Sequence, residues 1–291
     1  MAQPWMGKPL LYHYTGMSAL KGILTTRNLW ATDLRYLNDT AEYSYGVSML
    51  SEELGLLLEE RRLADPMCVD ELAALKYMIT ESESGPIYVV CLTAAGGDQL
   101  SQWRGYSAGG GVALGFAAAE LAAHAETLGF RLMTCIYKEA EQRAATRQYL
   151  DHCYQVMAGN RSRGRDRTVY GILGGGTFTK DFWPKFRELA PRLKAPGFGE
   201  EQEVRLVGWQ ETPPNIREGE TVLVPYLTVG LGMDLGTQSP RYAIHALKSI
   251  TIGPNSHPTR FVERSISAAF SSCGVHSVNV EVSSIPFRTG V

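Results

Sequence analysis

The sequence predicts an α+β protein whose mixed sheet is strongly curved or split. Its 291 residues are 44% hydrophobic and 20% charged, which is typical of a soluble globular chain with a sizeable core. Strand-like and helix-like patterns are interspersed along the chain. No repeat or long low-complexity tract separates them, so we expect one domain over residues 1–291.

The first elements follow from short patterns of apolar residues. A strand is expected over 10–15, and the Thr15-Gly16 turn leads into a helix over 17–27 whose apolar residues recur at helical spacing. A short strand over 29–32 follows. Helices are then expected over 41–64, where Asp39 or Thr40 can cap the start, and over 69–81.

The later elements are mostly strands. Pro86 precedes the apolar run 87–93, which reads as a buried strand. Asp98 can cap a short helical turn over 100–106 before the strand GVALGF at 111–116. Alternating residues predict two more strands, at 203–209 and 278–283.

Composition excludes several classes of protein. The formal net charge of −2 gives no overall basic field for nucleic acid or an anionic membrane. No apolar run approaches the ~20 residues that span a bilayer, and the N-terminus lacks the features of a secretory signal. Five scattered cysteines without a CxxC pair indicate reduced thiols, hence a cytoplasmic protein with no structural metal.

Common catalytic motifs are missing from the sequence. It contains no GxxxxGK[ST] loop, HExxH, GxSxG or zinc-deaminase signature. The glycines at 109–111 and 174–176 lack the GxGxxG spacing. The arginine-rich run 161–167 is either a solvated loop or a contact with a phosphate-bearing partner.

The first candidate cluster is Tyr12-His13-Tyr14-Thr15. Because a strand alternates its faces, His13 and Thr15 share one side, and the two tyrosines share the other. A histidine at a strand end is either a hydrogen-bonded structural residue or a ligand-binding one. Polar residues also precede the second helix, and capping explains Asp39 but not Asn38 and Glu42 as well.

Two further clusters lie in the middle and late parts of the chain. In SQWRGY, Trp103 and Tyr106 are neighbours at i and i+3, so they form either a wall for a planar ring or a plug in the core. In EQEVRL, we expect Glu201, Glu203 and Arg205 on one strand face. That face is either solvent-exposed or a site that stabilises a developing positive charge.

These clusters, in this order, resemble a bacterial domain family of unknown function. The resemblance rests on LYHYT (11–15), LWA (29–31), NDTAE (38–42), SQWRGY (101–106), GVALGF (111–116) and EQEVRL (201–206), with IGPNSHP (252–258) and SSIPFR (283–288) late in the chain. It covers most of the chain and implies no particular activity.

A more distant likeness is to ADP-ribosyltransferases of the His-Tyr-Glu type. It implies an ADP-ribosyltransferase-like fold in which His13 and Thr15 bind the ribose of NAD, and Glu203, with Glu201, stabilises an oxocarbenium-like transition state. The stacking aromatic would be Trp103 or Tyr106, although order along the chain favours Tyr36 or Tyr43. Asn38 and Arg205 are further candidates for contacts with NAD.

The resemblance therefore implies an ADP-ribosyltransferase or NAD glycohydrolase that acts on a protein or nucleic-acid acceptor, in the role of a toxin or a phage-defence effector. Breaking the nicotinamide–ribose bond needs a placed carboxylate more than a metal. We accordingly expect His13 and Glu203 to face one cleft. Two alternatives stay open. One is a metal-dependent nuclease using Asp39, Glu42, Glu201 and Glu203, and the other is a non-catalytic nucleotide-binding module.

Overall fold

A computed structural model describes residues 4–37, 41–80, 85–107, 110–162, 177–210, 212–231 and 246–286. The chain divides into two compact units. Unit 1 comprises Met1–Thr32, Tyr88–Thr134 and Gly199–Val291, and unit 2 comprises Asp33–Ile87 and Cys135–Phe198. The single domain expected over 1–291 stays a prediction.

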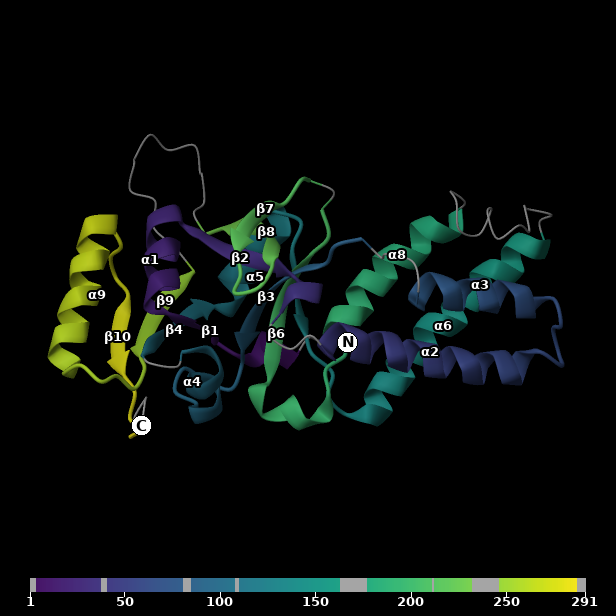
Figure 1. Ribbon diagram of the computed structural model, residues 1–291, viewed down its shortest axis with the longest axis horizontal. Helices are drawn as coiled ribbons and strands as arrows, with labels where there is room; N and C mark the ends of the chain where they lie inside the picture. Colours follow the sequence, from purple (N-terminus) through teal and green to yellow (C-terminus); the bar gives the residue numbers. More distant parts are fainter. Residues whose placement is uncertain are drawn as a thin grey trace. The chain divides into compact units, whose positions relative to one another are not determined.

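A mixed, open sheet forms the centre of unit 1 (Figure 1). Within the described residues it has ten strands, in the order β10-β9-β4-β1-β3-β2-β8-β7, while β6 pairs with β3 and β5. Only β9 and β10 are parallel among the strand pairs whose register is defined. The predicted α+β class with a mixed sheet is confirmed. The strands are β1 (Leu10–Gly16), β2 (Asn28–Asp33), β3 (Tyr88–Thr93), β4 (Gly111–Ala117), β5 (Arg131–Thr134), β6 (Glu203–Gly208), β7 (Asn215–Glu218), β8 (Leu223–Gly230), β9 (Leu247–Ile252) and β10 (Asn279–Val282).

The sheet is paired less extensively on one side of β1 than on the other. This strand pairs with β4 along its whole length, from Leu10 opposite Ala117 to Gly16 opposite Gly111. On its other side, the register with β3 consists of Tyr12 opposite Thr93. The defined register therefore joins β1 to β3 at this one pair. The predicted curvature or splitting of the sheet stays a prediction.

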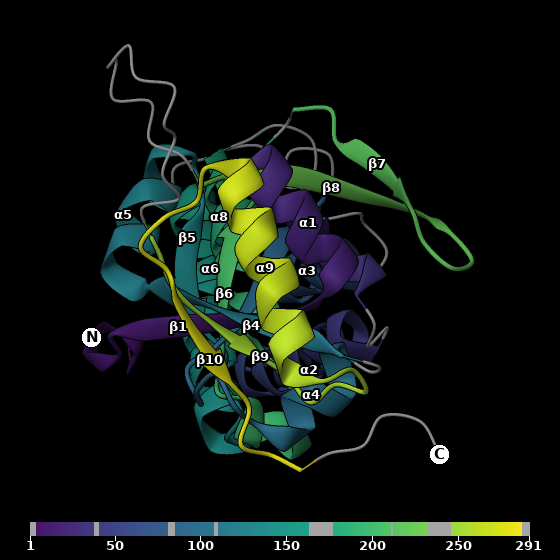
Figure 2. The ribbon, with the colours of Figure 1, turned by 90° about the vertical axis from the view of Figure 1, so that its left-hand side faces the viewer.

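Helices cover both faces of this sheet. The main core lies under α1 (Met17–Thr26), α5 (Ala118–Thr127) and α9 (Thr259–Cys273), which contribute apolar residues at helical spacing. Figure 2 shows α1 and α9 side by side. The short helix α4 (Leu100–Tyr106) packs on the opposite face, where Trp103 contacts Tyr14 and Ala113.

Unit 2 is mainly helical. Its helices are α2 (Ala41–Arg61), α3 (Cys68–Thr80), α6 (Glu139–Ser162) and α8 (Thr177–Leu189), with short 3-10 turns at Leu34–Tyr36 and Ala190–Arg192. Helix α2 packs on α3 and α6, and α6 packs on α8. Buried Leu and Phe side chains fill the interior, including Leu50, Leu54, Leu57, Leu75, Leu150, Phe182 and Phe186.

Charged residues also hold unit 2 together. Lys194 and Glu42 form a buried ion pair of 2.9 Å. Arg143 of α6, which is partly exposed, forms an ion pair of 2.7 Å with the buried Glu53 of α2. In the part of the chain that the structure describes, no helix has the length and apolar character needed to cross a membrane.

Candidate functional site

His13 lies in the middle of β1, and its side chain is anchored to the backbone of β3. Its Nδ1 donates a hydrogen bond of 2.9 Å to the carbonyl oxygen of Cys91. Burial lowers the pKa of His13, and the bond to that carbonyl offsets this only in part. The imidazole is therefore neutral at pH 7, with its Nδ1 protonated.

Glu203 and Arg205 form an ion pair at the start of β6. The Arg205 Nε lies 2.8 Å from Glu203 Oε1, and its Nη2 lies 2.9 Å from Oε2. Both residues are buried, with exposed fractions of 4% and 1%. Val204 lies between them and points into the main core, as predicted. The predicted face of Glu203 and Arg205 is therefore correct, but it is not a solvent face.

Strand register separates His13 from this ion pair. Glu203 lies opposite Thr93, and Thr93 lies opposite Tyr12, so these three side chains share one face of the sheet. His13 is the next residue after Tyr12 and therefore points to the other face, toward the main core. The prediction that His13 and Glu203 face one cleft is wrong.

Glu201 also departs from its predicted position. It is the last residue of a 3-10 helix over Pro196–Glu201 and does not belong to β6. Gln202 separates the two elements and has a left-handed backbone, with φ of 43°. The alternation from Glu201 to Glu203 is broken by this turn, so the three charged residues do not form one strand face. A left-handed non-glycine residue beside a candidate catalytic carboxylate is a strained feature typical of functional sites.

Trp103 is a plug in the core. It is 1% exposed, and its ring meets Tyr14 edge-on with centroids 4.6 Å apart. A Cβ atom at Gly253 would lie 2.8 Å from the Trp103 ring, which shows how closely the backbone approaches it. The wall for a planar ring that was predicted from Trp103 is therefore wrong, because no face of this indole is open. Tyr106 is 39% exposed and stays a candidate.

The remaining predicted residues are dispersed. Thr15 lies on the His13 side of β1, opposite Val112. Tyr36 and Tyr43 belong to unit 2, and Tyr36 is exposed. Asn38, like Asp39, lies outside the described residues, as does most of the arginine-rich run. Roles for these residues in NAD binding stay predictions.

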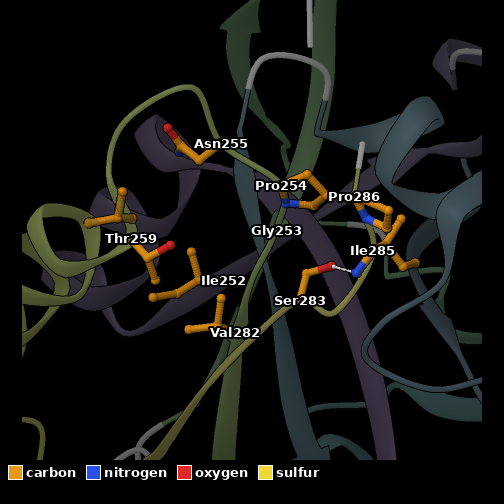
Figure 3. Close-up of a pocket in the computed structure, with 10 residues that line it drawn as sticks. Ile252, Gly253, Pro254, Asn255, Thr259, Val282, Ser283, Ile285 and Pro286 are labelled. Atoms are coloured by element: carbon orange, nitrogen blue, oxygen red, sulfur yellow. Dashed lines mark hydrogen bonds between the residues drawn. The ribbon is translucent and has the colours of Figure 1, made fainter. Parts of the chain in front are cut away.

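A cavity of about 270 Å³ lies beside the start of α9 in unit 1. Its residues were not assigned to a site from the sequence. It opens where the parallel strands β9 and β10 end and α9 begins (Figure 3). Figure 3 shows Asn255 and Thr259 on one side of this space and Ile285 and Pro286 on the other. Its lining residues are Ile252, Gly253, Pro254, Asn255, Thr259, Val262, Val282, Ser283, Ile285 and Pro286.

The segment GPNSHP shapes one side of this cavity. The Gly253 amide donates to the Gly111 carbonyl at 2.9 Å, which holds the chain beside β4. The Asn255 Oδ1 then accepts from the His257 amide at 2.9 Å, and this turn leads through Pro258 into α9. An alternating strand followed by Gly-Pro-Asn and a helix is the sequence signal that could have located the site.

A second cavity, of about 300 Å³, adjoins the first. Asn255 and Val262 line both. The second cavity lies between α1 and α9 and is mainly apolar, with Lys21 and His257 as polar members of its wall. Its lining residues are Met17, Leu20, Lys21, Leu24, Asn255, His257, Val262, Ser265, Ile266 and Ala269.

The carboxylates invoked for a nuclease are held by cations within their own units. Glu42 pairs with Lys194 in unit 2, and Glu203 pairs with Arg205 in unit 1. Across the described residues, no three His, Cys, Asp or Glu side chains are grouped as metal ligands.

Comparison with known proteins found a family model that matches part of the chain. Residues 102–206 match the family "Protein of unknown function (DUF2971)", a little over a third of the chain. The matched segment includes Trp103, Glu203 and Arg205 but neither His13 nor the residues that line the two cavities. No curated protein and no solved structure matches this chain.

Proposed function

We propose that unit 1 binds a nucleotide, with NAD as the leading candidate, through the two adjoining cavities beside α9. The phosphates would occupy the cavity of Figure 3, and the base would occupy the apolar cavity between α1 and α9. The observation that carries this proposal is that a cavity containing the Asn255 amide and the Thr259 hydroxyl adjoins an apolar cavity, at the carboxyl ends of two parallel strands.

The chemistry of the first cavity supports a phosphate. The Thr259 hydroxyl and the Asn255 amide group can donate hydrogen bonds to phosphate oxygens. The positive end of the α9 dipole points to the same place, and the first turn of α9 contains no Asp or Glu. Loops beyond the carboxyl ends of parallel strands are a common position for ligands in α/β units.

The second cavity supports a flat, mainly apolar group. Leu20, Ile266 and Ala269 line it, and a buried base would gain from contact with such side chains. Lys21 and His257 lie in the same wall, where they could reach a ribose or a phosphate. Each cavity alone is small for a dinucleotide, so we expect the ligand to extend across both.

Calorimetric titration with NAD, ADP and pyrophosphate tests the phosphate position. Thr259→Val removes one hydroxyl at nearly constant shape and should weaken all three ligands by about tenfold, the scale of one hydrogen bond to a charged group. Ser271→Ala removes an exposed hydroxyl from the far end of the same helix and serves as the control. Absence of binding by the wild-type protein would refute the proposal.

A second variant tests the position of the base. Ala269→Leu partly fills the apolar cavity and should weaken NAD and ADP while leaving pyrophosphate affinity unchanged. Equal loss for all three ligands would contradict the assignment of separate subsites. Full retention of NAD affinity would move the base out of this cavity.

ADP-ribosyl transfer to a macromolecular acceptor is the second candidate function. The observation that favours it is Glu203, a carboxylate fixed by Arg205 through two hydrogen bonds beside the strained Gln202. A fixed carboxylate can stabilise the positive charge that develops on ribose as nicotinamide leaves. In that case NAD would be a substrate, and its ribose would have to reach the sheet face that carries Glu203.

Single-turnover nicotinamide release, with cell lysate as a source of acceptor, tests this second function. Glu203→Gln keeps the side-chain shape and should lower release by at least ~100-fold while NAD binding is largely kept. Equal release by both proteins would remove Glu203 from catalysis. Magnesium-dependent cleavage of DNA or RNA, abolished by the same change, would support the nuclease instead.

A further inference from the structure

Asp98 links helix α4 to a segment that lies far away in the sequence, after β10. It lies between β3 and α4, and its carboxylate accepts four hydrogen bonds. One oxygen receives the Trp103 Nε1 at 2.8 Å and the Ser283 hydroxyl. The other receives the Ser284 amide at 2.8 Å and the Ser284 hydroxyl at 3.0 Å. Asp98 thereby links the buried Trp103 of α4 to Ser283, which lies 185 residues further along the chain than Asp98.

The segment that Asp98 binds, Ser283–Pro286, forms one side of the cavity in Figure 3. We call this cavity the phosphate cavity, after the ligand group proposed for it. After β10, the Ser283 amide donates to the Ile252 carbonyl at 2.8 Å, and the Ser283 hydroxyl accepts from the Ile285 amide at 3.1 Å. Ile285 then packs against the cluster of Tyr14, Trp103 and Ala113. Ser283, Ile285 and Pro286 line the cavity of Figure 3.

We propose that Asp98 is a positioning residue that holds the segment Ser283–Pro286 as a wall of the phosphate cavity. The proposal rests on the function proposed above. Asp98 itself does not line either cavity, so it acts on the ligand only through this segment.

The hydrogen bonds require a carboxylate at this position. Each oxygen of Asp98 accepts from one N–H group that cannot act as an acceptor: the Trp103 indole on one side and the Ser284 amide on the other. An asparagine side chain has a single acceptor oxygen, so its NH₂ group would face one of these N–H groups. Burial favours the neutral acid, but hydrogen bonds from Ser283, Trp103 and Ser284 outweigh it and lower the pKa of Asp98.

The decisive experiment compares Asp98→Asn with the wild-type protein by hydrogen exchange and by calorimetry. The Ser284 and Ile285 amides should exchange at least about tenfold faster, because a charge-assisted contact is lost. Pyrophosphate and NAD should bind at least about threefold more weakly, since the cavity wall is no longer held in one position. Glu281→Gln removes the same charge from an exposed position two residues before Ser283 and should change neither measurement.

A double-mutant cycle separates this role from general loss of stability. Trp103→Phe removes the indole N–H, so in that background the amide of Asp98→Asn can turn its NH₂ group away from Ser284. The effect of Asp98→Asn on exchange and on affinity should therefore be smaller in Trp103→Phe than in the wild type. If Asp98→Asn does not fold, Ser284→Ala removes one hydroxyl donor from an exposed residue and should shift both measurements in the same direction.

The outcomes distinguish this proposal from the function on which it rests. If the wild-type protein binds neither pyrophosphate nor NAD, the proposed function fails, and the exchange data still report on the Asp98 contacts. If exchange accelerates but affinity is unchanged, Asp98 holds the segment without positioning the cavity, and the inference is wrong. Equal effects of Asp98→Asn in both backgrounds would also overturn it.

Discussion

Tyr12 and His13 are consecutive residues of β1, so their side chains point to opposite faces of the sheet and meet different neighbours. Tyr12 shares its face with Thr93 and Glu203, whereas His13 points to the main core and bonds the Cys91 carbonyl. In that environment His13 is a neutral residue that holds β1 to β3. Its structural role is supported by hydrogen bonding, and any role with a ribose stays a prediction.

The buried imidazole makes stability depend on pH. Burial lowers the pKa of His13 in the folded protein, whereas the unfolded chain keeps a value of about 6.5. Below about pH 6.5 the unfolded state therefore binds the proton first, so the contribution of His13 is complete above that pH and is lost as pH falls.

His13→Asn should flatten this dependence, because its side-chain amide can still donate to the Cys91 carbonyl but does not titrate. The measurement is the urea midpoint at pH 7.5 and 5.5, with His276→Asn, at an exposed position, as the control. An unchanged difference between the two pH values in His13→Asn would contradict the assignment.

Glu203 and Arg205 pose a different problem at the same scale. Two buried charges that hydrogen-bond each other in a fork are costly to separate, because the remaining charge loses this charged partner inside the protein. Arg205→Met should lower the free energy of unfolding by ~3–5 kcal/mol. The double variant Glu203→Leu, Arg205→Met should recover most of that loss. Urea denaturation of the three proteins is the test, and additive losses in the double variant would show that the two residues act independently.

At the scale of elements, a glycine in β4 leaves room for larger side chains on the two strands beside it. Gly115 of β4 lies opposite both Tyr12 of β1 and Ser249 of β9. A Cβ atom at Gly115 would lie 2.3 Å from the Ser249 Oγ and 3.0 Å from the Tyr12 ring. Close packing across three strands therefore favours glycine at position 115. The backbone conformation of Gly115 does not demand a glycine.

Gly115→Ala should lower the free energy of unfolding by ~1–3 kcal/mol, the usual cost of overpacking a core. Gly22→Ala in α1 is the matched control, because a Cβ there meets nothing within 4 Å, and alanine should stabilise the helix by ~0.5–1 kcal/mol. Thermal or urea unfolding compares the two. A Gly115→Ala variant as stable as Gly22→Ala would show that β4 can shift to accept the methyl group.

At the scale of the whole molecule, each unit is assembled from segments that are far apart in the sequence. Unit 1 uses three segments and unit 2 uses two. The match to the family of unknown function runs through parts of both units, so it does not coincide with either. The two cavities, by contrast, are lined by residues of unit 1 alone.

Binding of NAD should therefore slow amide hydrogen exchange in unit 1 and leave unit 2 unchanged. Saturating NAD, at about 100 times its Kd, stabilises a binding-competent state by ~2.7 kcal/mol. Amides of β9, α9 and β10 should exchange more slowly in its presence, whereas those of α3 in unit 2 should not change. Protection confined to unit 2 would place the ligand elsewhere and contradict the proposal.

Local patterns in the sequence determined much of the secondary structure. The strands of LYHYT, GVALGF and EVRLVG and the helices beginning at Met17 and Ala41 follow from periodicity and turn residues within a few positions. The same alternation correctly assigned His13 and the tyrosines of β1 to opposite faces. These features depend on neighbours along the chain, so a single sequence contains the information needed.

Only the tertiary structure decided which faces meet. Whether Glu203 shares a face with His13 depends on the register of β1, β3 and β6, and the burial of Trp103 depends on Tyr14 and Gly253. The cavity beside α9 needs β10 parallel to β9, and its wall needs Asp98 to reach Ser283. Such contacts join residues tens to hundreds of positions apart, and no local pattern specifies them, because pairing and burial are properties of the whole packed chain.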